Sequence, residues 1–151
     1  MTRIFLAIAC CFVAVSAFAQ KITEQQLLGK WEISFVNIEG TTIDFETDAI
    51  TLAPGAAEAE GISEADIRAR IKGAMGTKAE SHVLFEQGHQ MLLSINGQED
   101  VSGQYTISEK DGQQFITHGG IKHKAEIKDG KLTLVLPGRG GTEIEIRFNK
   151  V

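Results

Sequence analysis

Hydrophobic and polar residues alternate with a period of two over most of the chain, a spacing typical of β-strands with one buried face. In the first such stretch, the alternation places Trp31, Ile33 and Phe35 on one face. Residues 41–46 alternate again. These two stretches therefore form either a tight hairpin or one long strand bent by a bulge at Gly40.

A different pattern interrupts the strands at about residues 55–79. Ser63 followed three residues later by Asp66 is a typical start of a helix, because both side chains can accept unpaired backbone amide protons. The apolar residues that follow recur at helical spacing. They are Ile67, Ile71, Ala74 and Met75. We predict a helix ending near Gly76, preceded by a short helix over residues 56–60.

After this insert, turn signals separate short apolar stretches every 8–12 residues. The turns are rich in glycine, asparagine and aspartate, as in Asn96-Gly97 and Asp129-Gly130. The predicted strands cover residues 82–86, 90–95, 101–108, 113–118, 121–128, 131–136 and 142–148. This pattern predicts an all-β fold, an antiparallel up-and-down β-barrel of about eight strands with an early helical insert. Closure into a barrel leaves no exposed sheet edge.

The first 19 residues have the pattern of a secretory signal peptide. Arg3 precedes an apolar run over residues 4–15, and Ala17-Phe18-Ala19 fits signal peptidase, with cleavage before Gln20. Residues 20–151 then form one secreted or periplasmic domain. The apolar run is too short to span a bilayer, so no transmembrane segment is expected.

Both cysteines of the chain, Cys10 and Cys11, lie in this predicted leader. Neither follows the triplet of a lipidation site, so we expect no lipid anchor, and the secreted domain has no disulfide or thiolate. The net charge of −5 argues against nonspecific binding to nucleic acid or to an anionic membrane. The sequence shows no nucleophile elbow, phosphate loop or paired-histidine metal motif. We therefore predict no catalytic residues, no metal site and no cofactor.

Several motifs occur in an order that resembles a known family. The first strand opens with Gly29-Lys30-Trp31, a hairpin follows over Phe85–Gly88, and a later strand contains Gly103-Gln104-Tyr105. A leucine-rich strand over residues 132–136 and a basic end over residues 147–151 complete the series. The chain thus resembles the lipocalin/calycin group, and within it the small bacterial secreted lipocalin-like domains.

This resemblance implies a barrel fold and two further expectations. In that group a late arginine packs over the tryptophan ring of the first strand, and Arg147 is the candidate for a cation–π contact with Trp31. Fatty-acid-binding proteins carry an early pair of helices over the ligand portal. The insert is similar in position, so Ile67, Ile71 and Met75 are candidate lid residues.

Two histidines are the most specific candidates for a binding site. If Gly119-Gly120 is a two-residue turn, His118 pairs with residue 121 and Ile116 with His123, so both imidazoles share a face. On an inward face they are polar groups in an apolar pocket. Ordinary hydrogen-bonded strand histidines are the alternative. The full set of predicted ligand-binding residues is Phe35, Phe45, Met91, Leu93, Tyr105, His118 and His123.

The leading hypothesis is a noncatalytic protein that binds a small apolar or amphipathic molecule inside the barrel. The first alternative is a filled barrel whose surface binds an envelope protein or a glycan. A third is an enzyme of the calycin type, which would use His118 and His123. An apolar cavity distinguishes the first hypothesis from the second, because a filled barrel has a packed interior and an exposed patch.

Overall fold

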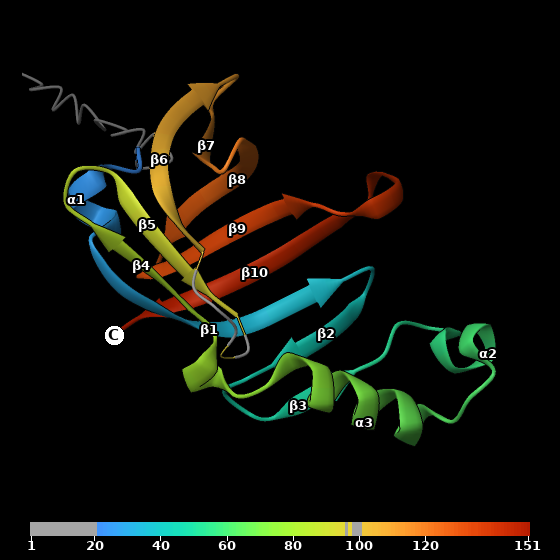
Figure 1. Ribbon diagram of the computed structural model, residues 1–151. Helices are drawn as coiled ribbons and strands as arrows, with labels where there is room; N and C mark the ends of the chain where they lie inside the picture. Colours follow the sequence, from blue (N-terminus) through green and yellow to red (C-terminus); the bar gives the residue numbers. More distant parts are fainter. Residues whose placement is uncertain (1–20, 96, 98–100) are drawn as a thin grey trace, which may run out of the picture.

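The computed structural model describes residues 21–95, 97 and 101–151, and the predicted signal peptide lies outside this part of the chain. Eight antiparallel strands follow one another around a barrel, and the last pairs with the first. The topology confirms the predicted up-and-down β-barrel (Figure 1). The strands are β1 (Gly29–Ile38), β4 (His82–Glu86), β5 (Gln90–Ser94), β6 (Val101–Lys110), β7 (Gln113–His118), β8 (Ile121–Lys128), β9 (Lys131–Pro137) and β10 (Glu143–Lys150).

Strand β1 pairs with three other strands. Along one edge it pairs with β10 from Trp31 to Ile38. Along the other edge it pairs first with β4 and then, from Phe35 onward, with β2 (Thr41–Asp44), which continues into β3 (Ala49–Thr51). The turn between β1 and β2 is a tight hairpin, with positive φ angles of 52° at Glu39 and 86° at Gly40. The hairpin alternative is therefore correct.

A β-bulge does interrupt β1, at Ser34. Ile33 pairs with Phe148, and the next pair along the ladder is Phe35 with Arg147, so Ser34 is an extra residue. The Ser34 hydroxyl donates a hydrogen bond to the Arg147 carbonyl at 3.1 Å. The extra residue reverses the alternation, so that Phe35 lies on the outer face. The prediction that Phe35 shares a face with Trp31 and Ile33 is wrong for this reason.

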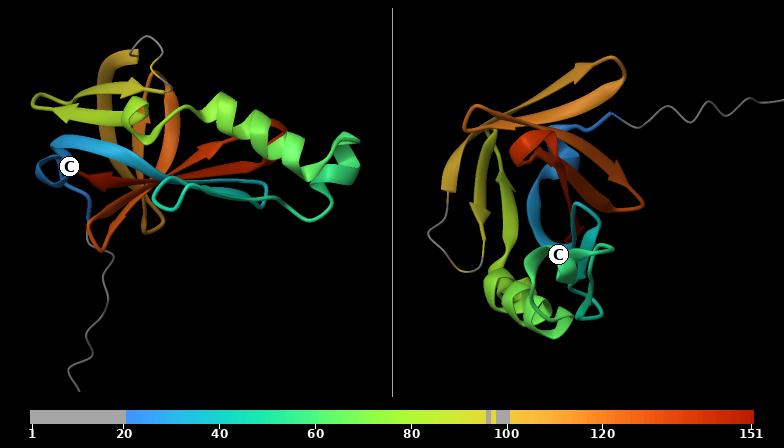
Figure 2. Two further views of the ribbon diagram at one scale, coloured as in Figure 1. Left: turned by 90° about the horizontal axis from the view of Figure 1, so that it is seen from below. Right: turned by 90° about the vertical axis from the view of Figure 1, so that its right-hand side faces the viewer.

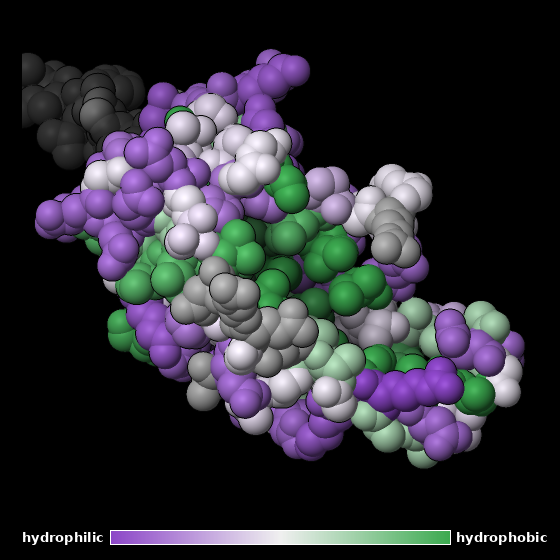
Figure 3. Space-filling view, in the orientation of Figure 1, coloured by the Kyte–Doolittle hydropathy of each residue, from purple (hydrophilic) through white to green (hydrophobic). Residues whose placement is uncertain are grey.

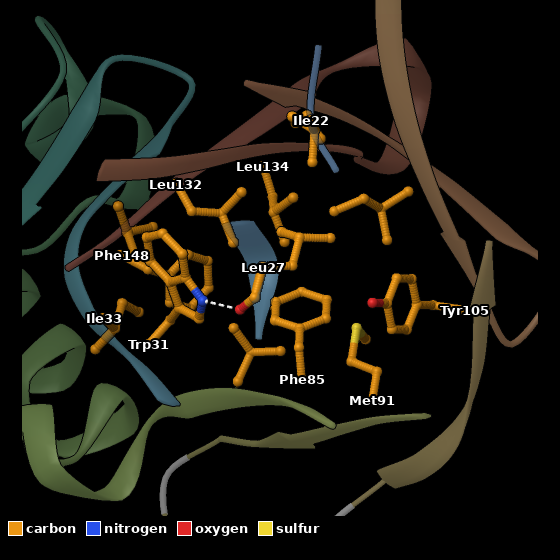
Figure 4. Close-up of a cluster of buried hydrophobic side chains, with 14 of the residues drawn as sticks. Ile22, Leu27, Trp31, Ile33, Phe85, Met91, Tyr105, Leu132, Leu134 and Phe148 are labelled. Carbon is orange, nitrogen blue, oxygen red and sulfur yellow. Dashed lines mark hydrogen bonds between the residues drawn. The ribbon is translucent and has the colours of Figure 1, made fainter. Parts of the chain in front are cut away.

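The barrel is closed at one end by a helical turn that the sequence analysis did not predict. Helix α1 (Glu24–Leu27) begins at Thr23, whose hydroxyl accepts a hydrogen bond from the Gln26 amide. Leu27 has no exposed surface, and its carbonyl accepts a hydrogen bond of 2.6 Å from Trp31 Nε1. Figure 4 shows Leu27 between Trp31 and Phe85, at the centre of the core. This end of the barrel is therefore a packed floor.

The cation–π contacts near the floor differ from the expected pair. Lys150 Nζ lies 5.2 Å from the centre of the Trp31 ring and donates a hydrogen bond to the Gln26 carbonyl. Arg147 instead packs over Phe35 on the outer face, at 4.5 Å. The prediction for Arg147 and Trp31 is wrong because Phe35 and Arg147 are paired on the outer face, whereas Trp31 faces inward.

The helical insert forms as predicted. Helix α2 (Ala56–Glu60) precedes α3 (Glu64–Met75), which begins at Ser63 and ends at Gly76. The Ser63 hydroxyl accepts a hydrogen bond of 3.1 Å from the Asp66 amide. The 3-10 turns η1 (Lys78–Glu80) and η2 (Arg139–Gly141) complete the described elements. The insert lies toward the barrel end opposite α1, as the views in Figures 1 and 2 show. Among the described helices, none has the length and apolar character needed to cross a membrane.

The packed floor gives a prediction for stability. Substituting Leu27→Ala should lower the free energy of unfolding by about 2–5 kcal/mol, because it leaves a cavity under Trp31 that the closed barrel cannot fill. Urea denaturation measures the change. Leu28→Ala is the matched control, since Leu28 is only partly buried. Equal losses in the two variants would show that α1 does not form the floor.

Candidate functional site

Five of the predicted ligand-binding residues lie together on the inner face of the barrel. Met91 and Leu93 come from β5, Tyr105 from β6, His118 from β7 and His123 from β8. Tyr105 pairs directly with His118. These four strands are consecutive neighbours in the sheet, so the five side chains form one continuous inner surface.

The two histidines occupy the positions that the turn predicts. His118 pairs with Ile121, and His123 pairs with Ile116, so the two imidazoles are diagonal neighbours on the same face. They are only 7% and 9% exposed. Gly103 leaves room for the His118 ring, because a side-chain carbon at that position would lie 3.0 Å from His118 Nε2.

His123 and Tyr105 each place an unpartnered polar atom in the barrel. Among the described residues, none supplies a hydrogen-bond partner to His123 Nδ1 or to the Tyr105 hydroxyl. Burial, with the neighbouring His118 as a smaller cause, lowers the pKa of His123 below its ordinary value. Burial also raises the pKa of Tyr105, with Glu24 as the second cause. Both groups are therefore uncharged at neutral pH.

Tyr105 reaches from this surface into the packed part of the core. It is 1% exposed, and its ring meets Phe85 edge to face at 5.1 Å between ring centres. Figure 4 shows its hydroxyl directed toward the middle of the cluster, with Met91 beside the ring. The residue thus contributes both to packing and to the polar character of the interior.

The inner surface becomes more exposed toward the end of the barrel opposite α1. Leu136, Ile144 and Ile146 face inward at this end and are partly buried against the core. Figure 3, which has the orientation of Figure 1, shows hydrophobic surface in a hollow at the centre of the view and more hydrophobic surface toward the helical insert. This open end is the mouth of the barrel.

Beside the mouth, a cleft of about 560 Å³ separates the insert from the β1–β2 hairpin. Ile38 and Ile43 form one wall, and the predicted lid residues Ile67, Ile71 and Met75 form the other. Arg70, Glu39 and Glu60 are the charged residues of the lining. Helix α3 has no fully buried residue. Its apolar stripe lines the cleft, and Ile71 and Met75 also pack, partly buried, against the edge of the core.

Two polar contacts join α3 to the neighbouring β-hairpin segment. Arg68 Nε donates a hydrogen bond to the Ile50 carbonyl at 3.3 Å, and Lys72 forms an ion pair with Asp48. Both contacts join α3 to the segment around β3. The exposed Lys72–Asp48 pair contributes at most about 1 kcal/mol. The part-buried Arg68 hydrogen bond and the packing of Ile71 and Met75 against the core add to the attachment of the insert.

The remaining predicted residues are less central. Phe45 packs against the core from just beyond β2, and Phe35 lies outside the barrel under Arg147. Ile38 and Ile43 line the cleft, but they were not predicted as site residues. The alternation after the bulge places Ile38 and Ile43 on the same face as Val36 once the extra residue at Ser34 is counted.

Within the described ranges, no group of three or more histidine, aspartate, glutamate or cysteine residues is placed to hold a metal ion. No protein-family model matches the sequence, and no curated protein matches it. Among solved structures, zebrafish ileal bile acid-binding protein complexed with cholic acid aligns with 83% of this chain and 99% of its own, at 16% identity and a TM-score of 0.36. At that score the alignment carries no inference about ligand or activity.

Burial of His123 predicts a specific dependence of stability on pH. The unfolded chain takes up a proton on this residue near the ordinary pKa of 6.5, whereas the folded protein resists protonation until lower pH. The unfolded state then binds more protons, so the free energy of unfolding should fall as pH drops below about 6.5. Substituting His123→Phe should reduce this fall, as measured by urea denaturation between about pH 7 and about pH 5.

Carboxylates affect a separate pH window. Backbone hydrogen bonds lower the pKa of Asp44 and of Glu80, whose ordinary values are 3.8 and 4.5. The stability that they contribute is lost only in more acidic solution. An unchanged slope below about pH 6.5 in His123→Phe would show that another group causes the fall.

Proposed function

We propose that the protein is a secreted, noncatalytic binding protein for a small apolar or amphipathic molecule. The bound molecule occupies the cleft beside the barrel mouth and extends onto the apolar inner surface. The insert over residues 55–79 acts as its lid. Secretion in this proposal rests on the signal-peptide pattern of residues 1–19.

The apolar cleft carries this proposal. Its volume of about 560 Å³ falls within the range of small-molecule sites, about 300–1,000 Å³. Isoleucines on both walls remain partly exposed to solvent, and an apolar ligand would remove their surface from water. The charged residues of the lining accommodate a polar end of the ligand at the solvent side.

The difference in packing between the two ends of the barrel supports entry of the ligand from one end only. Leu27, Trp31 and Phe85 fill the floor and are at most 1% exposed. The inward residues near the mouth, such as Leu93 and Leu136, remain partly exposed. A ligand therefore enters from the mouth, under the lid.

Native mass spectrometry of the protein, purified without detergent and then extracted with solvent, tests the proposal. We expect a stoichiometric small molecule that leaves on extraction and rebinds. Ile67→Glu and Met75→Glu should each weaken rebinding by at least about tenfold, because a carboxylate on the cleft wall must be desolvated when an apolar ligand is bound. Ala69→Glu is the matched control, since Ala69 is exposed on the same helix and does not line the cleft.

Two results would contradict the proposal. One is a clean mass of the free protein together with no binding from a panel of lipids and other amphiphiles. The other is equal loss of binding in Ala69→Glu and Ile67→Glu. The first result would favour the alternative of a module that binds an envelope protein or a glycan.

A further inference from the structure

A polar cluster lies inside the barrel on three consecutive strands, among apolar neighbours. It consists of Tyr105 on β6, His118 on β7 and His123 on β8, and we refer to it as the inner polar cluster. The pairing of Tyr105 with His118, and of His123 with the residue two places before His118, puts the three side chains side by side.

Unpaired polar atoms at this depth are costly. A buried hydrogen-bonding group without a partner lowers the free energy of unfolding by about 1–3 kcal/mol relative to one that is paired. Tyr105 and His123 each hold such an atom at 1% and 9% exposure. A third unpaired atom, His82 Nδ1, lies on β4 and is separate from the cluster. Two unpaired atoms on one inner surface are suited to a ligand that supplies both partners.

The surroundings of the cluster select the charge of that ligand. Among the described residues, the buried polar side chains are three serines and the two histidines, together with the Tyr105 hydroxyl. Among the residues whose burial is described, no lysine or arginine is buried with them. A carboxylate or phosphate placed here would lose its hydration without gaining a cation. A hydroxyl or carbonyl group, in contrast, needs only one or two hydrogen bonds, which the cluster can supply.

We propose that the inner polar cluster binds an uncharged hydroxyl or carbonyl group at the buried end of an amphipathic ligand. The Tyr105 hydroxyl donates a hydrogen bond to the ligand oxygen, and a ring nitrogen of His123 forms the second hydrogen bond. His118, beside Gly103, closes the mouth side of the group. The apolar body of the ligand then runs past Leu93 and Leu136 toward the cleft. This inference rests on the proposed function and specifies its ligand class.

Two probes with the same chain length test the charge preference. They are 1-decanol, which is uncharged, and decanoate, which carries a carboxylate at neutral pH. In isothermal titration calorimetry we expect 1-decanol to bind at least about tenfold more tightly than decanoate, because only decanoate has to bury a charge.

The variant Tyr105→Phe removes one hydroxyl and keeps the ring that packs on Phe85. Affinity for 1-decanol should fall about threefold to tenfold, the ordinary loss for one hydrogen bond, while affinity for decanoate stays the same. The melting temperature of the free protein should be unchanged or higher, since the variant removes an unpaired buried group. His123→Phe should weaken 1-decanol binding to a similar extent. Thr106→Val is the matched control, because it removes an exposed hydroxyl from the same strand.

The outcomes separate this inference from the proposed function. If Ile67→Glu abolishes 1-decanol binding but Tyr105→Phe and His123→Phe do not change it, the lidded site is supported and the role of the cluster is overturned. If decanoate binds as tightly as 1-decanol and loses affinity in the cluster variants, the preference for an uncharged group is wrong. If neither probe binds the unsubstituted protein, both proposals fail.

Discussion

The pairing of β1 with β10 is the constraint on which the rest of the structure depends. It closes the barrel and satisfies the backbone groups of what would otherwise be two exposed sheet edges. The opposite edge of β1 is divided between β4 and β2. Because β4 leaves β1 after Glu32, the wall beyond this point is built by the β1–β2 hairpin and the insert. The cleft lies at this division, so barrel closure and site position have one origin.

Much of the fold could be predicted because its turns are encoded locally. Pairs such as Asp111-Gly112 and Asp129-Gly130 adopt positive φ angles at both residues, which suits tight hairpins. Each such turn fixes the register of its two strands, and the period of two then assigns every side chain to a face. The placement of His118 and His123 on one face follows from one turn, Gly119-Gly120. That this face is the inner one depends on how the sheet closes into a barrel.

The parts that could not be predicted depend on contacts between distant segments. The bulge at Ser34 is set by the register between β1 and β10, and a single stretch of alternating residues gives no sign of an extra residue. It places Phe35 outside and so changes the partner of Arg147. Helix α1 has only four residues, too few for a periodic pattern. Its position depends on Trp31, which accounts for the missed floor.

The two ends of the barrel differ in how tightly their side chains are packed. At the floor, large side chains interlock, and the Trp31 indole is fixed by the Leu27 carbonyl. A ligand cannot enter without breaking this packing. Toward the mouth the aliphatic residues are partly exposed, and between the two ends Tyr105 and His123 hold polar atoms that lack partners within the described chain. Unpaired buried polar atoms lower stability, and the close packing of the floor contributes stability that offsets this cost. In the proposed function, stability therefore depends on the floor and recognition on the mouth, and the unpartnered polar atoms of the interior find their partners on the bound molecule.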